Sequence, residues 1–226
     1  MINFFKYFYY LHYRPKIFFP KLTYSTFGED LVVKKFFRHK KKGFYVDIGC
    51  YHPLEGNNTY LLFKKGWSGI NVDVNSLSID LFNYNRKKDF NVNVAVSNQN
   101  KKLKIYFRKK INMLNTSSKK LAKIHFRNGY QERLIKSSTL NSIISRTKFK
   151  KKIDFLNIDV EGNELNVLKS LNFLKYRPKL ICVEIHNHEK MYNKNLDYLK
   201  RNVVYKFLIN KGYKIYWKNG FSFIFK

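Results

Sequence analysis

Acidic residues are scarce in this 226-residue chain, where Asp and Glu total 15 against 45 Lys and Arg and the formal net charge is +30. Cysteine is also scarce. Only Cys50 and Cys182 occur, so we expect neither a disulfide scaffold nor a multi-cysteine zinc site. No run of about eighteen uncharged apolar residues is present, so no membrane-spanning helix is expected. The first residues lack a small-residue cleavage site, and we therefore expect a cytoplasmic protein without a secretory signal.

The excess of positive charge has a compositional explanation that must be weighed first. Lys outnumbers Arg by 36 to 9, and Lys, Asn, Phe, Ile and Tyr, whose codons are rich in A and T, together supply 117 residues. We therefore attribute the charge mainly to biased base composition. A polyanion-binding surface and a membrane-binding surface stay open as alternatives.

Short apolar runs alternate with helical patterns along most of the chain. They predict an α/β fold with a mainly parallel seven-stranded sheet, helices on both faces and a C-terminal antiparallel hairpin. A long helix is expected at 196–211. We expect residues 1–22 to form an aromatic, basic arm and residues 23–226 to form one domain. Within that domain, residues 108–150 are expected to be a variable insertion of short helices that recognises the substrate. The predicted strands are 43–49, 68–74, 91–96, 153–159, 180–186, 213–217 and 221–225, and residues 103–107 form a further alternating run.

Four of the few acidic residues fall at the ends of predicted strands: Asp47, Asp73, Asp159 and Glu184. In a parallel sheet these ends share one edge, which is where ligands bind. The turn after Asp47 contains Gly49 but lacks the further glycines of a dinucleotide-binding turn, and no phosphate-binding loop motif occurs. An acid-glycine turn, followed by a second-strand acid that can accept both ribose hydroxyls, is the pattern of S-adenosylmethionine sites.

Six motifs together resemble FkbM-type methyltransferases, which are class I, Rossmann-like enzymes that use S-adenosylmethionine. The resemblance covers residues 23–190, with Thr26 where the family usually has Gln and Asp73 where it often has Glu. The motifs are YSTFGED (24–30), GFYVDIGCYHPLEGNNTYLLFKKGW (43–67), INVDVN (70–75), NVAVSN (93–98), IDFLNIDVEGNELNVLKSL (153–171) and RPKLICVEIH (177–186).

The resemblance implies a cofactor-binding role for residues of the first three strands. Asp47 and Gly49 would border the methionine end of S-adenosylmethionine, Asp73 would hold its ribose, and Asn93 to Val96 would approach its adenine. Glu29 would close over the cofactor. The competing interpretations are a strand-terminating turn for Asp47 and Gly49, and helix capping for Asp73 and Glu29.

Catalysis is expected at the carboxyl ends of the predicted strands 153–159 and 180–186, which contain Asp159 and Glu184. Asp159 and Glu161 would face the transferred methyl group, and Glu184 and His186 share one face of an extended strand. His186 is the best-suited general base, with Glu184 orienting it, since methyl transfer to a hydroxyl must also remove a proton. The alternatives are a capping role for Glu161, a structural role for His186, and a divalent-metal site that adds His188. His52, in the loop after the first strand, could line the same pocket or have a structural role.

These observations predict an O-methyltransferase acting on a glycan sugar or a specialised metabolite. Two alternatives remain: a nucleic-acid methyltransferase, suggested by the net charge of +30, and a non-catalytic protein that retains the fold. Exposed aromatic residues beside cations in the arm also suggest peripheral contact with a membrane.

Overall fold

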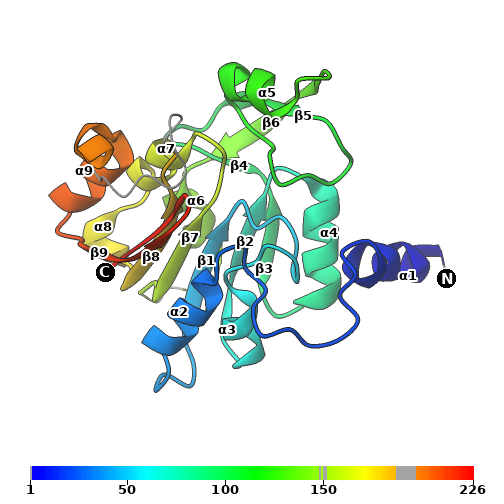
Figure 1. Cartoon of the computed structure of the whole chain (residues 1–226), viewed down its shortest axis with the longest axis horizontal. Helices are drawn as coiled ribbons and strands as arrows, with labels where there is room; N and C mark the ends of the chain where they lie inside the picture. The colour runs from blue at the N-terminus through cyan, green and yellow to red at the C-terminus, as the bar shows by residue number, and fades with distance from the viewer. Residues whose placement is uncertain (1, 148, 150–151, 187–196) are drawn as a thin grey trace.

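The computed structural model describes residues 2–147, 149, 152–186 and 197–226 (Figure 1). Its main sheet has the strand order β3-β2-β1-β7-β8-β10-β9, and a smaller sheet has the order β4-β6-β5. The strands are β1 (Phe44–Ile48), β2 (Ser68–Asp73), β3 (Phe90–Asn93), β4 (Ala95–Val96), β5 (Lys102–Phe107), β6 (Gln131–Ser138), β7 (Phe155–Ile158), β8 (Leu180–Glu184), β9 (Ile215–Asn219) and β10 (Ser222–Phe225).

The pairing of the strands confirms the predicted α/β architecture. Strand β1 runs parallel to β2 and β7, and the sheet continues in parallel to β3 on one side and β8 on the other. Strand β10 is antiparallel to both β8 and β9, which is the predicted C-terminal hairpin. The carboxyl ends of β1, β2, β7 and β8 therefore share one edge, as the positions of their acidic residues require.

Helices cover both faces of the main sheet. Side chains alternate across β1, so that Phe44, Val46 and Ile48 pack with α6, α7, α8 and α9, whereas Tyr45 packs with α2 and α3. No helix within the described residues is long and apolar enough to cross a membrane. The helices are α1 (Ile2–Phe8), α2 (Glu29–Phe36), α3 (Tyr60–Lys64), α4 (Ser76–Asn85), α5 (Lys119–His125), α6 (Leu140–Ser145), α7 (Glu164–Lys169), α8 (Phe173–Tyr176) and α9 (Val203–Asn210), with a π-helix η1 (Tyr9–Tyr13) and a 3₁₀ helix η2 (Asp197–Arg201).

The structure corrects the prediction of one strand over 91–96. Strand β3 stays in the main sheet, but the chain leaves it at Val94, whose N–H donates to the carbonyl of Asp73, and β4 pairs with β6 instead. The insertion 108–150 contains the expected short helices and also β6, which pairs with β5 along six residues of each strand. Strand β6 escapes sequence detection because its side chains are mostly polar and at the surface.

The predicted helix 196–211 is in fact two shorter elements. Residue 196 lies outside the described residues, and η2 ends before Asn202. The side chain of Asn202 accepts hydrogen bonds from the N–H groups of Val204 and Tyr205 and so begins α9. An Asn cap of this kind starts a new helix because it satisfies N–H groups that have no partner within that helix.

A buried arginine holds together the loop that follows β1. Arg86, at the end of α4, is completely buried and donates to the carbonyl of Pro53 at 2.7 Å and to the side chains of Asn57 and Thr59 at 2.8 Å. Thr59 in turn donates to the carboxylate of Asp47 at 2.8 Å. The guanidinium thus supports the turn that forms the edge of the sheet.

We expect replacement of Arg86 by Met to destabilise the protein by about 3–5 kcal/mol, because removal of one partner leaves buried polar groups uncompensated. Urea unfolding followed by circular dichroism measures the change. The matched control is Arg201→Met at an exposed position, which should change the free energy of unfolding by no more than about 0.5 kcal/mol. Equal effects of the two substitutions would contradict the supporting role of Arg86.

Candidate active site

The turns after β1 and β7 touch at the carboxyl edge of the sheet. Gly49 has a φ of +77°, and a Cβ atom at this position would lie 1.7 Å from the carbonyl oxygen of Asp159. Only glycine permits both this backbone conformation and this approach. Gly49 and Asp159 also line one cavity, about 540 Å³ of space that includes its opening to solvent.

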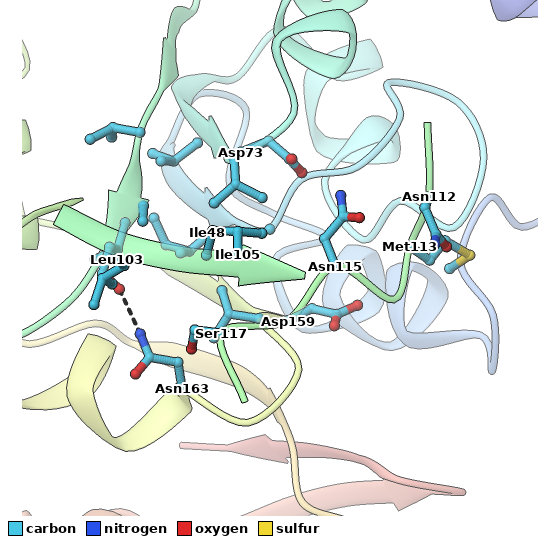
Figure 2. Close-up of a pocket in the computed structure, with 17 residues that line it drawn as sticks. Ile48, Asp73, Leu103, Ile105, Asn112, Met113, Asn115, Ser117, Asp159 and Asn163 are labelled. Atoms are coloured by element: carbon cyan, nitrogen blue, oxygen red, sulfur yellow. Dashed lines mark hydrogen bonds between the residues drawn. The ribbon is translucent and has the colours of Figure 1, made fainter. Parts of the chain in front are cut away.

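The carboxylate of Asp73 lies in the wall of this cavity (Figure 2). Its two oxygens accept hydrogen bonds from the backbone N–H groups of Tyr51 at 2.8 Å and Asn75 at 2.7 Å. Burial raises the pKa of Asp73 to about 6, although both N–H donors oppose the shift. Each carboxylate oxygen keeps a further lone pair for a ligand. The competing capping role falls to Asn75, which accepts from the N–H of Leu77 at the start of α4.

An apolar slot completes the cavity beside Asp73. Val94 and Val96 line it, as do Leu103 and Ile105 of β5, and the latter two are labelled in Figure 2. Asn163 donates to the carbonyl of Val96 at 2.9 Å and fixes the loop there. A flat, apolar ring system fits such a lining, with polar groups at one end to orient it.

Asp47 and Asn93, two of the predicted cofactor residues, have side chains outside this cavity. Asp47 is buried beneath the turn, where its carboxylate accepts from Asn157 and Thr59, both at 2.8 Å. Asn93 donates to the carbonyl of Asp73 at 2.8 Å and does not line the cavity. These two residues therefore shape the site without facing it.

Glu29 lies in a separate small pocket, which also contains Asp159 and Glu184. Its carboxylate accepts from the hydroxyl of Ser222 at 2.5 Å and from the N–H of Phe27 at 2.8 Å. These bonds fasten the start of α2 to β10, so the structure supports an anchoring position for Glu29.

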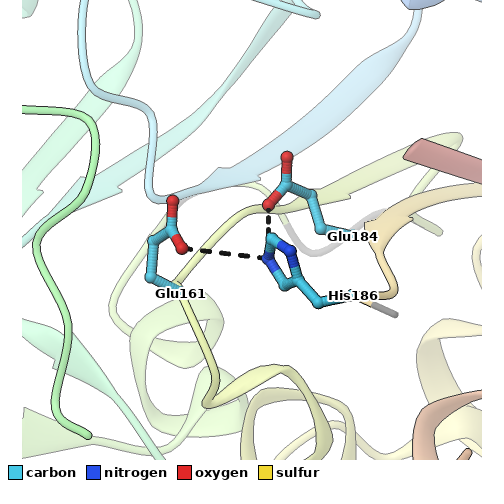
Figure 3. A group of neighbouring side chains, drawn as sticks. All are labelled: Glu161, Glu184 and His186. Atoms are coloured by element: carbon cyan, nitrogen blue, oxygen red, sulfur yellow. Dashed lines mark ion pairs between the residues drawn. The ribbon is translucent and has the colours of Figure 1, made fainter. Parts of the chain in front are cut away.

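A second, wider cleft adjoins the cavity at Asp159, which lines both. The cleft brings together the four predicted catalytic residues, Asp159, Glu161, Glu184 and His186. The carboxylates of Glu161 and Glu184 flank the imidazole of His186 (Figure 3). Nε2 of His186 lies 3.1 Å from Oε2 of Glu184 and 3.8 Å from Oε2 of Glu161.

Glu161 is held in an unusual backbone conformation that directs it into the cleft. Its φ is +52°, in the left-handed region that non-glycine residues seldom adopt. The hydroxyl of Thr116 donates to its carbonyl at 2.6 Å, and Nε2 of His125 lies 3.2 Å from its carboxylate. Asn163, not Glu161, occupies the N-cap position of α7, although its side chain makes no capping hydrogen bond there.

The electrostatics of the cleft favour retention of protons. Burial, reinforced by Glu184, raises the pKa of Glu161 to about 8, and the same two causes raise the pKa of Asp159 well above its ordinary value. The hydrogen bond to Glu184 raises the pKa of His186 above 6.5. These are the shifts expected where one group must accept or hold a proton at neutral pH.

Three further residues line the cleft that the sequence did not single out: Arg14, Lys109 and His125. Lys109 and His125 lie within residues 108–150, the segment expected to recognise the substrate, whereas Arg14 comes from the arm. Local sequence patterns do not predict which distant segments these residues contact. His52 instead has a structural position, where Nδ1 accepts from the N–H groups of Leu54 and Glu55.

The cluster also has the donor set of a divalent-metal site. One donor atom from each of Glu161, Glu184 and His186 lies within 4.8 Å of the others. His188, the further ligand considered from the sequence, lies outside the described residues. Two carboxylates and one imidazole suit several divalent cations, so the metal alternative stays open.

A comparison with protein families gives one match. The family described as the methyltransferase FkbM domain matches residues 47–214, which is more than half of the chain. A search of curated proteins finds no match.

Replacing Glu184 by Gln should lower the pKa of His186 toward 6.5, because the ion-paired hydrogen bond that raises this pKa is lost. An NMR titration of the imidazole C–H signals measures the shift. The control is Glu132→Gln, which removes an exposed carboxylate paired with Lys104 and should leave His186 unchanged. An unchanged His186 pKa in the Glu184 variant would refute the pairing.

Proposed function

The chain belongs to the FkbM methyltransferase family, and we propose that it transfers a methyl group from S-adenosylmethionine to a hydroxyl of a glycan sugar or a specialised metabolite. One observation carries this proposal. A cavity with a ribose-type carboxylate at Asp73 meets a cleft with a carboxylate–imidazole pair at Glu184 and His186, and Asp159 lines both. Donor and acceptor can therefore approach from opposite sides.

The cavity residues fit S-adenosylmethionine. Asp73 would accept the ribose hydroxyls with the lone pairs that Tyr51 and Asn75 leave available. The apolar side chains of Val96, Leu103 and Ile105 would enclose the adenine. The backbone of Gly49, held against the carbonyl of Asp159, would border the methionine portion. A positively charged sulfur beside Asp159 would favour the ionised form of its carboxyl group.

The cleft residues would manage the proton of the acceptor. S-adenosylmethionine supplies a methyl group on a sulfonium, and transfer to a hydroxyl yields an ether, a neutral thioether and one proton. His186 would accept that proton, while Glu184 at 3.1 Å orients the imidazole and stabilises its charge. The walls formed by Arg14 and Lys109 would contact the rest of the acceptor.

The acceptor is more consistent with a carbohydrate or small molecule than with a nucleic acid. Three carboxylates, Asp159, Glu161 and Glu184, gather where the acceptor must bind. These carboxyl groups offer oxygen acceptors for the hydroxyls of a sugar, and any of them that ionises repels the phosphates of a polynucleotide, even though the net charge of +30 would attract it at long range.

Asp73→Ala should weaken S-adenosylmethionine binding by about tenfold to a hundredfold, as expected for loss of hydrogen bonds to a charged group. Binding to the unmodified protein should also weaken as the pH falls through about 6, because the carboxyl then becomes protonated. Isothermal titration calorimetry between pH 5 and 8 measures both effects. Asp80→Ala on the adjoining helix is the control, and its affinity should not change. Equal affinities for the Asp73 and Asp80 variants would refute the ribose role.

His186→Asn should lower the rate of methyl transfer by about 10²- to 10⁴-fold, the usual contribution of general base catalysis, without changing S-adenosylmethionine affinity. Transfer of label from radioactive methyl groups to candidate sugars measures the rate. His39→Asn at an exposed position is the control.

The same assay distinguishes a base from a metal site. Dialysis against a chelator should leave activity intact if His186 accepts the proton directly. Loss of activity that Mg²⁺ restores would instead assign Glu161, Glu184 and His186 to a metal ion.

A further inference from the structure

The N-terminal arm exposes an unusual number of large apolar side chains. Phe5 is 64% exposed, Phe19 is 83% exposed and Leu22 is 82% exposed. Scattered apolar residues are normal on a protein surface, but a dense group within one short segment marks an interaction site. The exposed members within residues 4–22 are Phe4, Phe5, Phe8, Tyr9, Tyr13, Phe18, Phe19 and Leu22.

The arm is anchored on one side and exposed on the other. Tyr7, Tyr10 and Leu11 pack against a cluster that includes Leu77 and Leu81 of α4. The outward rings form pairs along the helical segment, with centroids 6.3 Å apart for Phe4–Phe8 and 5.6 Å apart for Tyr9–Tyr13. Figure 1 shows α1 extending outward beyond α4. The arm therefore has a fixed inner face and an uncovered outer face.

The charge of the arm has one sign. It contains Lys6, Arg14, Lys16 and Lys21, and residues 1–22 include no Asp or Glu. Cations next to exposed aromatic rings match the boundary of an anionic bilayer, where rings enter the headgroup region and cations meet lipid phosphates. A single weak signal does not hold a protein on a membrane, but apolar insertion combined with basic residues does.

We propose that residues 4–22 dock this protein on an anionic membrane surface. The charge argues against a second copy as the occupant, because two chains of net charge +30 repel each other. The exposed aliphatic Leu22 argues against a surface devoted to stacking nucleic-acid bases.

Docking by the arm would also bring the acceptor cleft to the lipid surface. Arg14 belongs to the arm and lines the cleft that contains Glu184 and His186. The arm thus contributes both the exposed apolar face and one residue of the cleft wall. An acceptor attached to a lipid would then reach the cleft without leaving the membrane.

Co-sedimentation of the full chain with vesicles tests this proposal and requires no enzymatic activity. The neutral vesicles contain phosphatidylcholine alone, and the anionic vesicles also contain about 30% phosphatidylglycerol. We expect binding to the anionic vesicles and little binding to the neutral ones. Phe5→Ser combined with Phe8→Ser should weaken binding by about tenfold or more, because two aromatic rings that would be buried in the bilayer are removed.

Leu174→Ser is the matched control, since Leu174 is 99% exposed but lies in α8, far along the chain from the arm. It should bind vesicles as the unmodified protein does. The proposal is overturned if no vesicle binds, if neutral and anionic vesicles bind equally, or if the arm and Leu174 variants behave alike. It is also overturned if analytical ultracentrifugation shows that the Phe5 and Phe8 substitutions only convert a dimer to a monomer, or if single-stranded RNA binds in place of vesicles. Intact S-adenosylmethionine binding in all variants separates this result from the proposed function.

Discussion

The site depends on the contact between the backbone of Gly49 and the carbonyl of Asp159. This contact leaves no space for a side chain and brings the turn after β1 against the turn after β7. Asp159 consequently borders both the cavity that contains Asp73 and the cleft that contains His186. If the two turns were separated by even one methyl group, the donor and acceptor compartments would no longer meet at one residue.

The carboxylates at the sheet edge have different roles because their neighbours differ. Asp47 lies in a network of amide, hydroxyl and guanidinium groups, which satisfies it and leaves it to support the turn. Asp73 has two backbone donors and a face open to the cavity. Glu161 and Glu184 lie near each other and near imidazoles, and within the described residues neither forms an ion pair with Lys or Arg. Burial, reinforced by the nearby Glu184, therefore raises the pKa of Glu161 above its ordinary value.

Much of the fold could be predicted because periodicity and strand-end residues reflect local physical constraints. The apolar runs ending in Asp73 and Glu184, and the hairpin formed by β9 and β10, follow directly from such patterns. Strand β6 could not be found, since an exposed polar strand has no hydrophobic alternation. The end of β3 could not be predicted, because β4 pairs with β6, which is a tertiary interaction.

The candidate site was also predictable only in part. The convergence of Asp159, Glu161, Glu184 and His186 followed from strand topology and residue spacing. The buried position of Asp47, the anchoring of Glu29 by Ser222 and the contribution of His125 depend on partners far away in sequence. No local pattern of residues records which side of a turn a carboxylate will face.

A crystal structure with S-adenosylhomocysteine tests the central claim most directly, namely that Asp159 lies where cofactor and acceptor meet. The account predicts ribose hydroxyls within hydrogen-bond distance of the Asp73 carboxylate, adenine between Val96 and the side chains of β5, and the sulfur beside Asp159 on the side facing His186. Binding of the ligand in the wide cleft instead, with no contact to Asp73, would contradict the account.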